Sequence, residues 1–110
     1  MGDIYSAKIG NTGNDTVRPV LVIQNNIANK YSKTVTVIPI TTVINKAKLP
    51  THVYVNLLNR DSVILAENVT TISKSRLDEY ITTLDTKKIV EVKKALDIQF
   101  GSDKIFLEDY

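Results

Sequence analysis

Apolar residues follow short alternating or continuous runs along the first two thirds of the chain, and this pattern predicts β-strands. Residues 2–8 alternate around Ile4 and Ala7, whereas residues 17–24 form a nearly continuous β-branched run that suits a strand buried on both faces. The density of Val, Ile and Thr is typical of β structure. Three further strands are expected at residues 34–40, 52–56 and 62–71.

The C-terminal part changes to a period of 3.6 residues. Asp85 can cap a helix that begins at Thr86, and Gly101 is a suitable stop. One face of this helix is apolar, formed by Ile89, Val92, Ala95 and Leu96. Five or six strands and one helix predict a mainly β (α+β) fold, a small, strongly twisted β-barrel with a C-terminal helix packed on it. The 110 residues fit one domain, residues 1–110.

Composition limits the chemistry. The chain has no Cys and a single His, which excludes disulfides, thiolate zinc sites, thiol nucleophiles and multi-His metal sites. A carboxylate-only metal site stays open, but we expect chemistry without a metal or cofactor. No apolar run approaches 18 residues and the first residues lack the pattern of a signal peptide, so we expect a cytoplasmic protein with no membrane contact.

Charge is distributed unevenly along the chain. The formal net charge is only +2, which does not by itself indicate a nucleic acid partner. Residues 1–56, however, hold six Lys or Arg and only two Asp. A positive face built from this half is therefore expected.

Arg18 is the first candidate for chemistry. It precedes Pro19 where a glycine- and asparagine-containing loop enters the apolar strand. A guanidinium is always charged and its planar fork of donors suits phosphate oxygens. The alternative is a surface arginine paired with Asp15, and position alone favours this alternative.

Two other segments carry polar groups beside apolar strands. Thr41 and Thr42 follow an apolar strand, where a hydroxyl can donate to a phosphate oxygen, although two solvent-facing threonines fit as well. His52 is the default acid–base candidate, but a lone His is more often structural or exposed. With Lys46 and Lys48 it forms either a basic loop that follows a nucleic acid backbone or a solvated loop.

Glu67 and Asn68 interrupt the apolar run at residues 62–71. A charge inside a buried strand needs a partner, and Arg18 or Arg60 is the natural one. The pair could position a substrate, or it could mark a bulge or an edge. The sequence holds neither a phosphate-cradling glycine loop nor the spacing of a serine triad.

Several motifs together resemble the MazF/PemK toxin family, the endoribonuclease halves of bacterial toxin–antitoxin pairs. The match runs nearly end to end, with weaker agreement after residue 66. Its anchors are Gly-Asp-Ile-Tyr at residues 2–5, Arg-Pro-Val-Leu-Val-Ile-Gln-Asn at 18–25, Asn-Lys-Tyr-Ser at 29–32, Ile-Thr at 40–41, Lys-Ala-Lys-Leu-Pro-Thr-His-Val at 46–53 and Asp-Ser-Val-Ile-Leu at 61–65.

The resemblance implies a small SH3-like barrel of the MazF/PemK/CcdB type, a homodimer, and metal-independent cleavage of single-stranded RNA. It also implies a cognate antitoxin that blocks the RNA groove. Contact with DNA is implied only through this antitoxin. The family's active-site arginine and threonine fall on Arg18 and Thr41. The RNA contacts implied by the resemblance involve Asn29, Lys46, Lys48, Pro50, Thr51, His52, Glu67 and Asn68.

Two departures from the family leave alternatives open. Relatives carry a Glu five residues before the arginine, where this chain has Gly13, so Asp15 or His52 is a weaker candidate for proton transfer. A cation expected after the Glu-Gln pair is Thr70 here. These losses keep a second hypothesis in place: a non-catalytic binding protein on the same barrel, either a degenerate toxin that binds antitoxin or a CcdB-like poison of a protein target.

Overall fold

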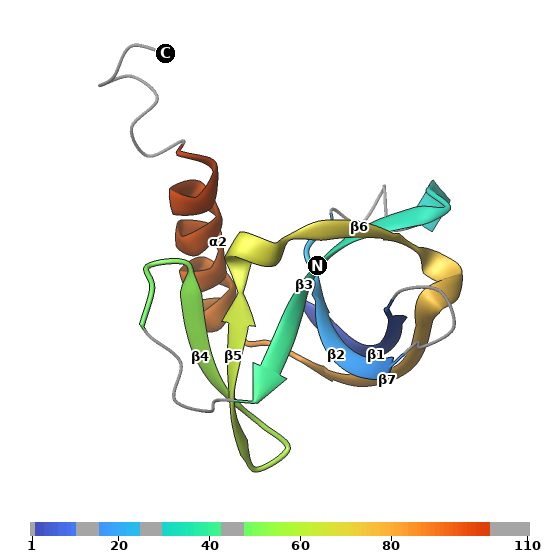
Figure 1. Ribbon diagram of the computed structural model, residues 1–110, viewed down its shortest axis with the longest axis horizontal. Helices are drawn as coiled ribbons and strands as arrows, with labels where there is room; N and C mark the ends of the chain where they lie inside the picture. Colours follow the sequence, from blue (N-terminus) through green and yellow to red (C-terminus); the bar gives the residue numbers. More distant parts are fainter. Residues whose placement is uncertain (1, 11–15, 25–29, 43–47, 102–110) are drawn as a thin grey trace.

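The computed structural model describes residues 2–10, 16–24, 30–42 and 48–101, which form a curled antiparallel sheet with one long helix against it (Figure 1). The sheet has seven strands in the order β4-β5-β3-β2-β1-β7, with β6 also paired to β3. The expected mainly β fold with a C-terminal helix is confirmed. The strands are β1 (Asp3–Ile9), β2 (Thr16–Val22), β3 (Thr34–Thr42), β4 (His52–Leu57), β5 (Arg60–Leu65), β6 (Thr70–Ser73) and β7 (Leu77–Thr83).

Strand β3 curls the sheet because its two halves have different partners. Its first half, Thr34 to Val37, pairs with β6, and its last three residues pair with β5. From β6 the chain passes through a short 3₁₀-helix, η2 (Lys74–Arg76), into β7, which pairs with β1. In Figure 1 the strands β1, β2, β3, β6 and β7 therefore surround a common interior. This ring is the predicted twisted barrel.

The buried residues form two clusters, one on each face of the sheet. The first cluster joins β4, β5 and the helix and includes Ile4, Leu21 and Val92. The second fills the ring and includes Val20 and Val22. Strand β2 contributes to both clusters because successive side chains point to opposite faces. Its first half differs from the prediction: Val17 is 59% exposed, so only the second half of the run is buried on both faces.

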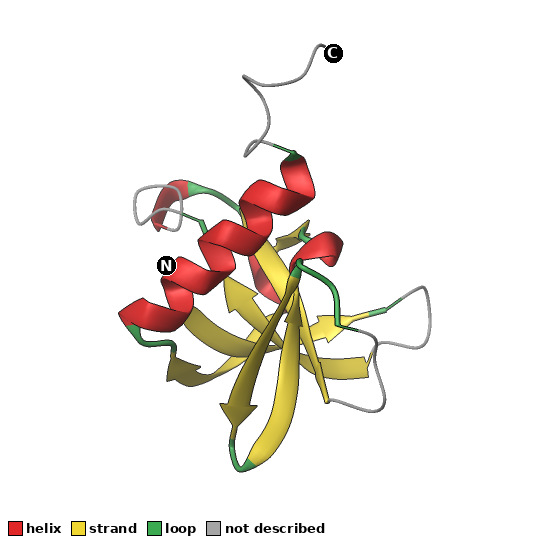
Figure 2. Ribbon diagram, turned by 90° about the vertical axis from the view of Figure 1, so that its left-hand side faces the viewer, coloured by secondary structure: helices red, strands yellow, loops and turns green. Residues whose placement is uncertain are grey.

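Helix α2 (Thr86–Phe100) confirms the predicted helix at both ends. The Asp85 side chain accepts a hydrogen bond from the backbone N–H of Lys88 at 2.8 Å, and Gly101 adopts a positive φ of 70° at the C-terminus. The helix buries Val92 and Ala95 as it lies across the sheet (Figure 2). Among the described residues, no helix is long and apolar enough to cross a membrane.

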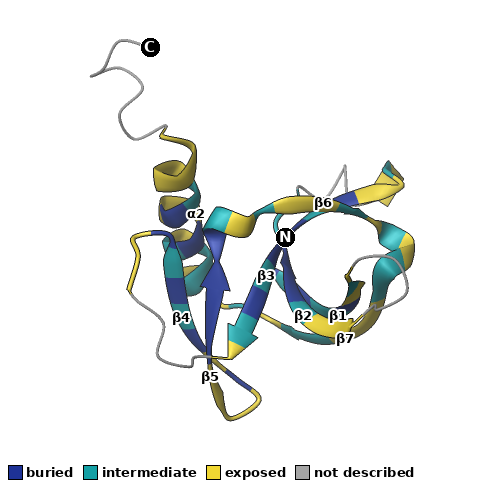
Figure 3. Ribbon diagram, viewed as in Figure 1, coloured by how far each residue is buried: buried dark blue, intermediate teal, exposed yellow. Residues whose placement is uncertain are grey.

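One prediction about strands was wrong, and one strand was missed. The run at residues 62–71 is not one strand, because a 3₁₀-helix, η1 (Ala66–Asn68), separates β5 from β6. Strand β7 was not predicted, because its residues alternate poorly: none is fully buried, and three in succession are exposed. Figure 3 shows this contrast between the buried central strands and the more exposed β6 and β7.

Candidate active site

The main pocket opens where β2 and β3 diverge. These strands pair only between Val20–Val22 and the middle of β3, ending at the pair Val20 and Pro39. Pro39, the last β3 residue of this ladder, has no backbone N–H to donate. Beyond it, the exposed start of β2 pairs with β1, while the last residues of β3 turn to β5. This change of partners separates the two strands and leaves a hollow between them.

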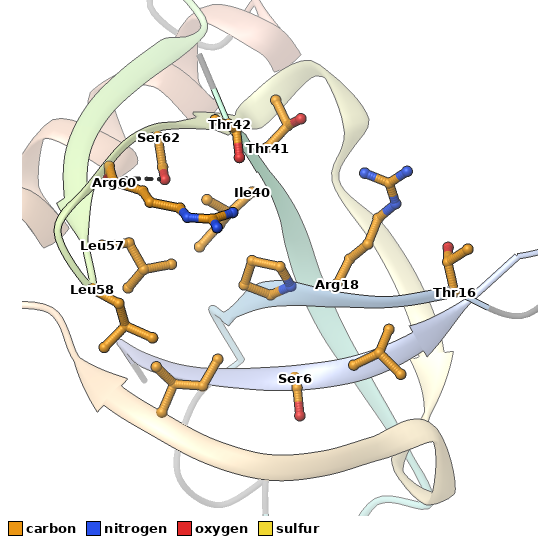
Figure 4. A pocket seen from close by; sticks show the side chains of 13 residues that line it. Ser6, Thr16, Arg18, Ile40, Thr41, Thr42, Leu57, Leu58, Arg60 and Ser62 are labelled. Atoms are coloured by element: carbon orange, nitrogen blue, oxygen red, sulfur yellow. Dashed lines mark hydrogen bonds between the residues drawn. The ribbon is translucent and has the colours of Figure 1, made fainter. Parts of the chain in front are cut away.

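This hollow is a pocket of about 580 Å³ with walls from three parts of the sheet (Figure 4). Its polar groups come from β2, β3 and the β4–β5 hairpin, and its apolar groups lie between them. The lining residues are Thr16, Val17, Arg18 and Pro19 of β2, Ile40, Thr41 and Thr42 of β3, Leu57, Leu58, Arg60 and Ser62 of the hairpin, and Ser6 and Ile81 beneath.

Arg18 and Thr41, 23 residues apart in the sequence, line the same pocket. Arg18 lies on the exposed half of β2, opposite Ala7 of β1, and its guanidinium points over the hollow (Figure 4). Thr41 is held in place by its pairing with Val63 of β5. Among the described residues, no carboxylate lies within ion-pair distance of the Arg18 guanidinium. The cation therefore faces the pocket with its donors available to an anion.

The hairpin between β4 and β5 supplies a third wall that the sequence analysis did not predict. Arg60 was considered there only as a partner for Glu67, but it lines the pocket and makes no contact with that residue. Leu58 lines the same wall and is 71% exposed. Side chains two residues apart in a strand point to the same face, and Ser62 is buried. This alternation could have placed Arg60 on the same face as Ser62.

His52 belongs to a second polar cluster with Glu67 and Thr51. Its Nε2 lies 2.8 Å from Oε2 of Glu67, and the Thr51 hydroxyl donates to Oε1 at 3.1 Å. The His52 side chain is only 5% exposed, and its Nδ1 is buried without a hydrogen-bond partner. The strand predicted at residues 52–56 is confirmed, because His52 begins β4, but its side chain is packed inside and is not part of a solvated loop. Glu67 finds its partners here, not at Arg18 or Arg60.

Glu67 is held as a carboxylate by these donors. Partial burial alone raises the pKa of its carboxyl, because it disfavours the charged form. Hydrogen bonds from its own backbone N–H, from His52 and from Thr51, together with the charge of His52, outweigh burial and place the pKa below its ordinary value. The cluster thus stabilises the junction between η1 and β4.

The two polar clusters lie at opposite ends of the β4–β5 ladder. His52 pairs with Leu65 at one end, while Leu57 and Arg60 close the hairpin at the pocket. The five residue steps from His52 to Leu57 span about 17 Å at 3.4 Å per residue. Within one chain, His52 lines a different pocket from Arg18 and Thr41.

The other predicted RNA-contacting residues are spread over the surface near the second cluster. Lys48, Pro50 and Asn68 are exposed, and Pro50 shares a pocket of about 330 Å³ with His52 along α2. Asp15, Asn29 and Lys46 lie outside the described residues, as does Gly13. Across the part of the chain that the structure describes, no three His, Asp or Glu side chains gather as a set of metal ligands.

Several known proteins are similar to this chain in sequence or in fold. The chain is 48% identical to the Endoribonuclease MazF of Staphylococcus epidermidis over 91% of this chain and 89% of that protein. It superposes on the Mycobacterium tuberculosis toxin MazF-mt6 with a TM-score of 0.78 and 29% identity, covering 90% and 96% of the two chains. A mycobacterial endoribonuclease solved with its cognate antitoxin has the same fold, with a TM-score of 0.77, 23% identity and coverage of 91% and 92%.

The family assignment rests on most of the chain. Residues 1–100 match the family described as PemK-like, MazF-like toxins of type II toxin–antitoxin systems. The barrel, the α2 helix and the pocket with Arg18 and Thr41 all fall within this match. The chain therefore belongs to the PemK-like, MazF-like toxin family.

Proposed function

We propose that this chain is the toxin of a type II toxin–antitoxin system and acts as an endoribonuclease on single-stranded RNA. One observation carries the proposal: Arg18 and Thr41 face a common pocket at the point where β2 and β3 diverge. A guanidinium without an acidic partner among the described residues, in one pocket with a hydroxyl, suits the oxygens of a phosphodiester. The similar protein of Staphylococcus epidermidis is named an endoribonuclease, which supports this activity for the present chain.

The reaction needs little from the protein because RNA supplies its own nucleophile. The ribose 2′-oxygen attacks the adjacent phosphorus and loses its proton, and the bond from phosphorus to the 5′-oxygen breaks. The 5′-oxygen then receives a proton, which leaves a 2′,3′-cyclic phosphate and a free 5′-hydroxyl. Negative charge on the non-bridging oxygens rises as the phosphorane forms. A cation fixed before the reaction stabilises this charge most effectively.

Arg18 is the group that stabilises the phosphorane. Its guanidinium is placed at the mouth of the pocket and can donate two parallel hydrogen bonds to the developing oxyanion. Thr41 donates a further hydrogen bond and helps to align the phosphate. Arg18 itself is a poor base at neutral pH because guanidinium pKa values exceed about 12. The proton-transfer step is therefore assigned to other groups, with Asp15 the candidate nearest in sequence.

This mechanism requires no metal ion. A chain with one His and no Cys offers few soft or imidazole ligands, and the 2′-hydroxyl makes an activated water unnecessary. We also propose the partners that such a toxin uses: a cognate antitoxin, a second copy of the chain in a homodimer, and DNA only through the antitoxin. Its site of action would be the cytoplasm, where its RNA substrate is present.

The decisive experiment is to incubate the purified protein with a long single-stranded RNA in EDTA and map both ends of each cut. The proposal expects cleavage at a short recurring sequence, with cyclic phosphate on the upstream fragment. Arg18→Ala is the matched control for a contaminating nuclease. Cleavage that stops in EDTA and returns with added divalent metal contradicts the metal-free mechanism. A folded protein that binds RNA or antitoxin without any cleavage supports the non-catalytic alternative.

A further inference from the structure

A second arginine enters the candidate active site from the side opposite Arg18. Arg60 is the first residue of β5, and its side chain reaches into the same pocket (Figure 4). The Ser62 hydroxyl donates to the Arg60 carbonyl oxygen at 3.2 Å and fixes the backbone there. Pairing of Arg60 with Leu57 closes the hairpin and sets the direction of the side chain. Arg60 is thus held at the pocket by the fold.

Among the described residues, Arg60 has no acidic partner. Its neighbour Asp61 lies on the opposite face of β5, where it accepts a hydrogen bond from Asn56 at 3.4 Å. Ion pairs within the described residues involve neither Arg60 nor Arg18. Two guanidinium groups in one concave site repel each other and concentrate anions. The positive charge of the pocket therefore suits a ligand with more than one negative group.

The two cations occupy separate positions. Strand β2 has separated from β3 where Arg18 stands, whereas β5, which carries Arg60, pairs with the last residues of β3. Figure 4 shows Thr41 and Thr42 between the guanidinium groups of Arg18 and Arg60. The pocket volume of about 580 Å³ is in the range of sites that hold a whole small ligand, not a single phosphate. Two cations at different walls of one pocket thus suit two phosphates of one strand.

We propose that Arg60 binds the phosphate next to the scissile one, so that the RNA strand is held on both sides of Thr41. This inference rests on the proposed endoribonuclease function. Fixing a neighbouring phosphate restricts the strand before the reaction and helps to bring the 2′-oxygen in line with the bond that breaks. Because this contact is the same in the ground state and the transition state, it acts mainly on KM.

The first test compares variants of Arg60 with a matched loss of charge elsewhere. Arg60→Ala should lower kcat/KM by about tenfold through KM and should reduce the log–log salt slope of RNA binding by about 0.7, the value for one single-strand phosphate contact. Arg60→Lys should recover part of the loss because it keeps the charge. Lys93→Ala is the control, since Lys93 is exposed on α2 and lines none of the described pockets. Equal effects of Arg60→Ala and Lys93→Ala overturn the inference.

The second test locates the phosphate. A short RNA carrying 2′-O-methyl at the mapped cut is bound but not cleaved, and a neutral methylphosphonate is placed at each phosphate in turn. A methylphosphonate next to the scissile phosphate should weaken RNA binding by the wild-type protein several-fold. The same substitution should leave RNA binding by the Arg60→Ala variant unchanged. The assignment is contradicted if the effect of Arg60→Ala depends on a neutral group at the scissile phosphate instead, or on a neutral group at no phosphate. Failure of the proposed function is recognised separately, because the wild-type protein then cuts no RNA.

Discussion

Nε2 of His52 lies 2.8 Å from Oε2 of Glu67, and this contact ties the start of β4 to the short helix between β5 and β6. The Thr51 hydroxyl bonds the other carboxylate oxygen at 3.1 Å. Two side-chain donors from one segment thus hold a single carboxylate from another. The contact stabilises the break in the sheet that the apolar pattern of residues 62–71 did not predict.

The first prediction concerns acid stability. The pKa of Glu67 is lower in the folded protein than its ordinary value, so its charged form stabilises the fold. This stability is fully present above the unfolded pKa of about 4.3 and is lost as the pH falls through the folded pKa. Glu67→Gln should therefore reduce the unfolding free energy at pH 7 by about 1–2 kcal/mol and flatten its decrease below pH 5.

Urea unfolding between pH 3 and pH 7 measures this effect. Glu79→Gln is the control, because Glu79 is exposed on β7 and its hydrogen bonds to Ser6 involve only its backbone. A Glu67→Gln profile parallel to the wild type at every pH would mean that the carboxylate adds no pH-dependent stability.

The second prediction separates structure from chemistry at His52. Its side chain is buried against Glu67 and lines a different pocket from Arg18, so His52→Ala should lower the unfolding free energy. Turnover at saturating RNA, and the dependence of turnover on pH, should be preserved. Stopped assays across pH 5–9 on the folded variant provide the measurement. Loss of a limb near neutrality, with stability unchanged, would assign His52 to proton transfer.

Local sequence patterns predicted the strongest elements and missed those set by long-range contacts. The helix with its Asp85 cap and Gly101 stop was predicted from nearby residues alone, because caps and periodicity are local. The burial of Val17 depends on whether β3 continues beside it, and Pro39 ends that pairing. Such divergence of strands cannot be recognised from one strand's composition.

The candidate site was predictable only in part for the same reason. Arg18 and Thr41 came from a family motif, and the structure places both on one pocket. Arg60 escaped prediction because its position depends on where the β4–β5 hairpin turns and packs. His52 was predicted to begin a strand, but its contact with Glu67 comes from a segment 15 residues away, and this contact and the burial of the side chain could not be recognised locally.

The third prediction tests the cation in the pocket. Arg18→Ala and Arg18→Lys should each reduce kcat at saturating RNA by at least about a hundredfold, since lysine keeps the charge but not the planar fork. Thr41→Val keeps the shape and removes the hydroxyl, and about a tenfold loss is expected. Lys93→Ala controls for net charge. Folded Arg18 variants that retain activity would place the chemistry elsewhere.

The fourth prediction concerns assembly. One pocket accommodates a short stretch of RNA, and two copies side by side can provide a longer channel, so we expect a homodimer. We expect the interface to include parts of residues 38–42 or of the run 64–72, where Ile38, Ile40 and Ile64 are buried within the chain itself. Such an interface would use the more accessible residues of these ranges, among them Thr42, Asn68, Thr70 and Thr71, which are exposed. Sedimentation showing a monomer well above micromolar concentration would contradict a dimer.

The fifth prediction concerns the strained turn beside Arg60. Leu58 and Asn59 form the two-residue loop of the β4–β5 hairpin and both have positive φ, 50° and 63°. A left-handed conformation costs about 1–2 kcal/mol for most side chains, whereas Asn and Gly adopt it readily. Leu58 is also 71% exposed, so little burial offsets this cost. Leu58→Asn should therefore raise the unfolding free energy by about 0.5–1 kcal/mol.

Chemical denaturation and RNA cleavage should be measured on the same samples, with Leu49→Asn as a control at an exposed leucine whose φ is not positive. Strain that persists at a pocket wall is often retained for function. We therefore expect Leu58→Asn to cleave RNA less efficiently even though it is more stable, because an apolar surface for a base is lost from the rim. Greater stability with unchanged cleavage would show that the turn serves the hairpin alone, and a decrease in stability would show that contacts of Leu58 outweigh its strain.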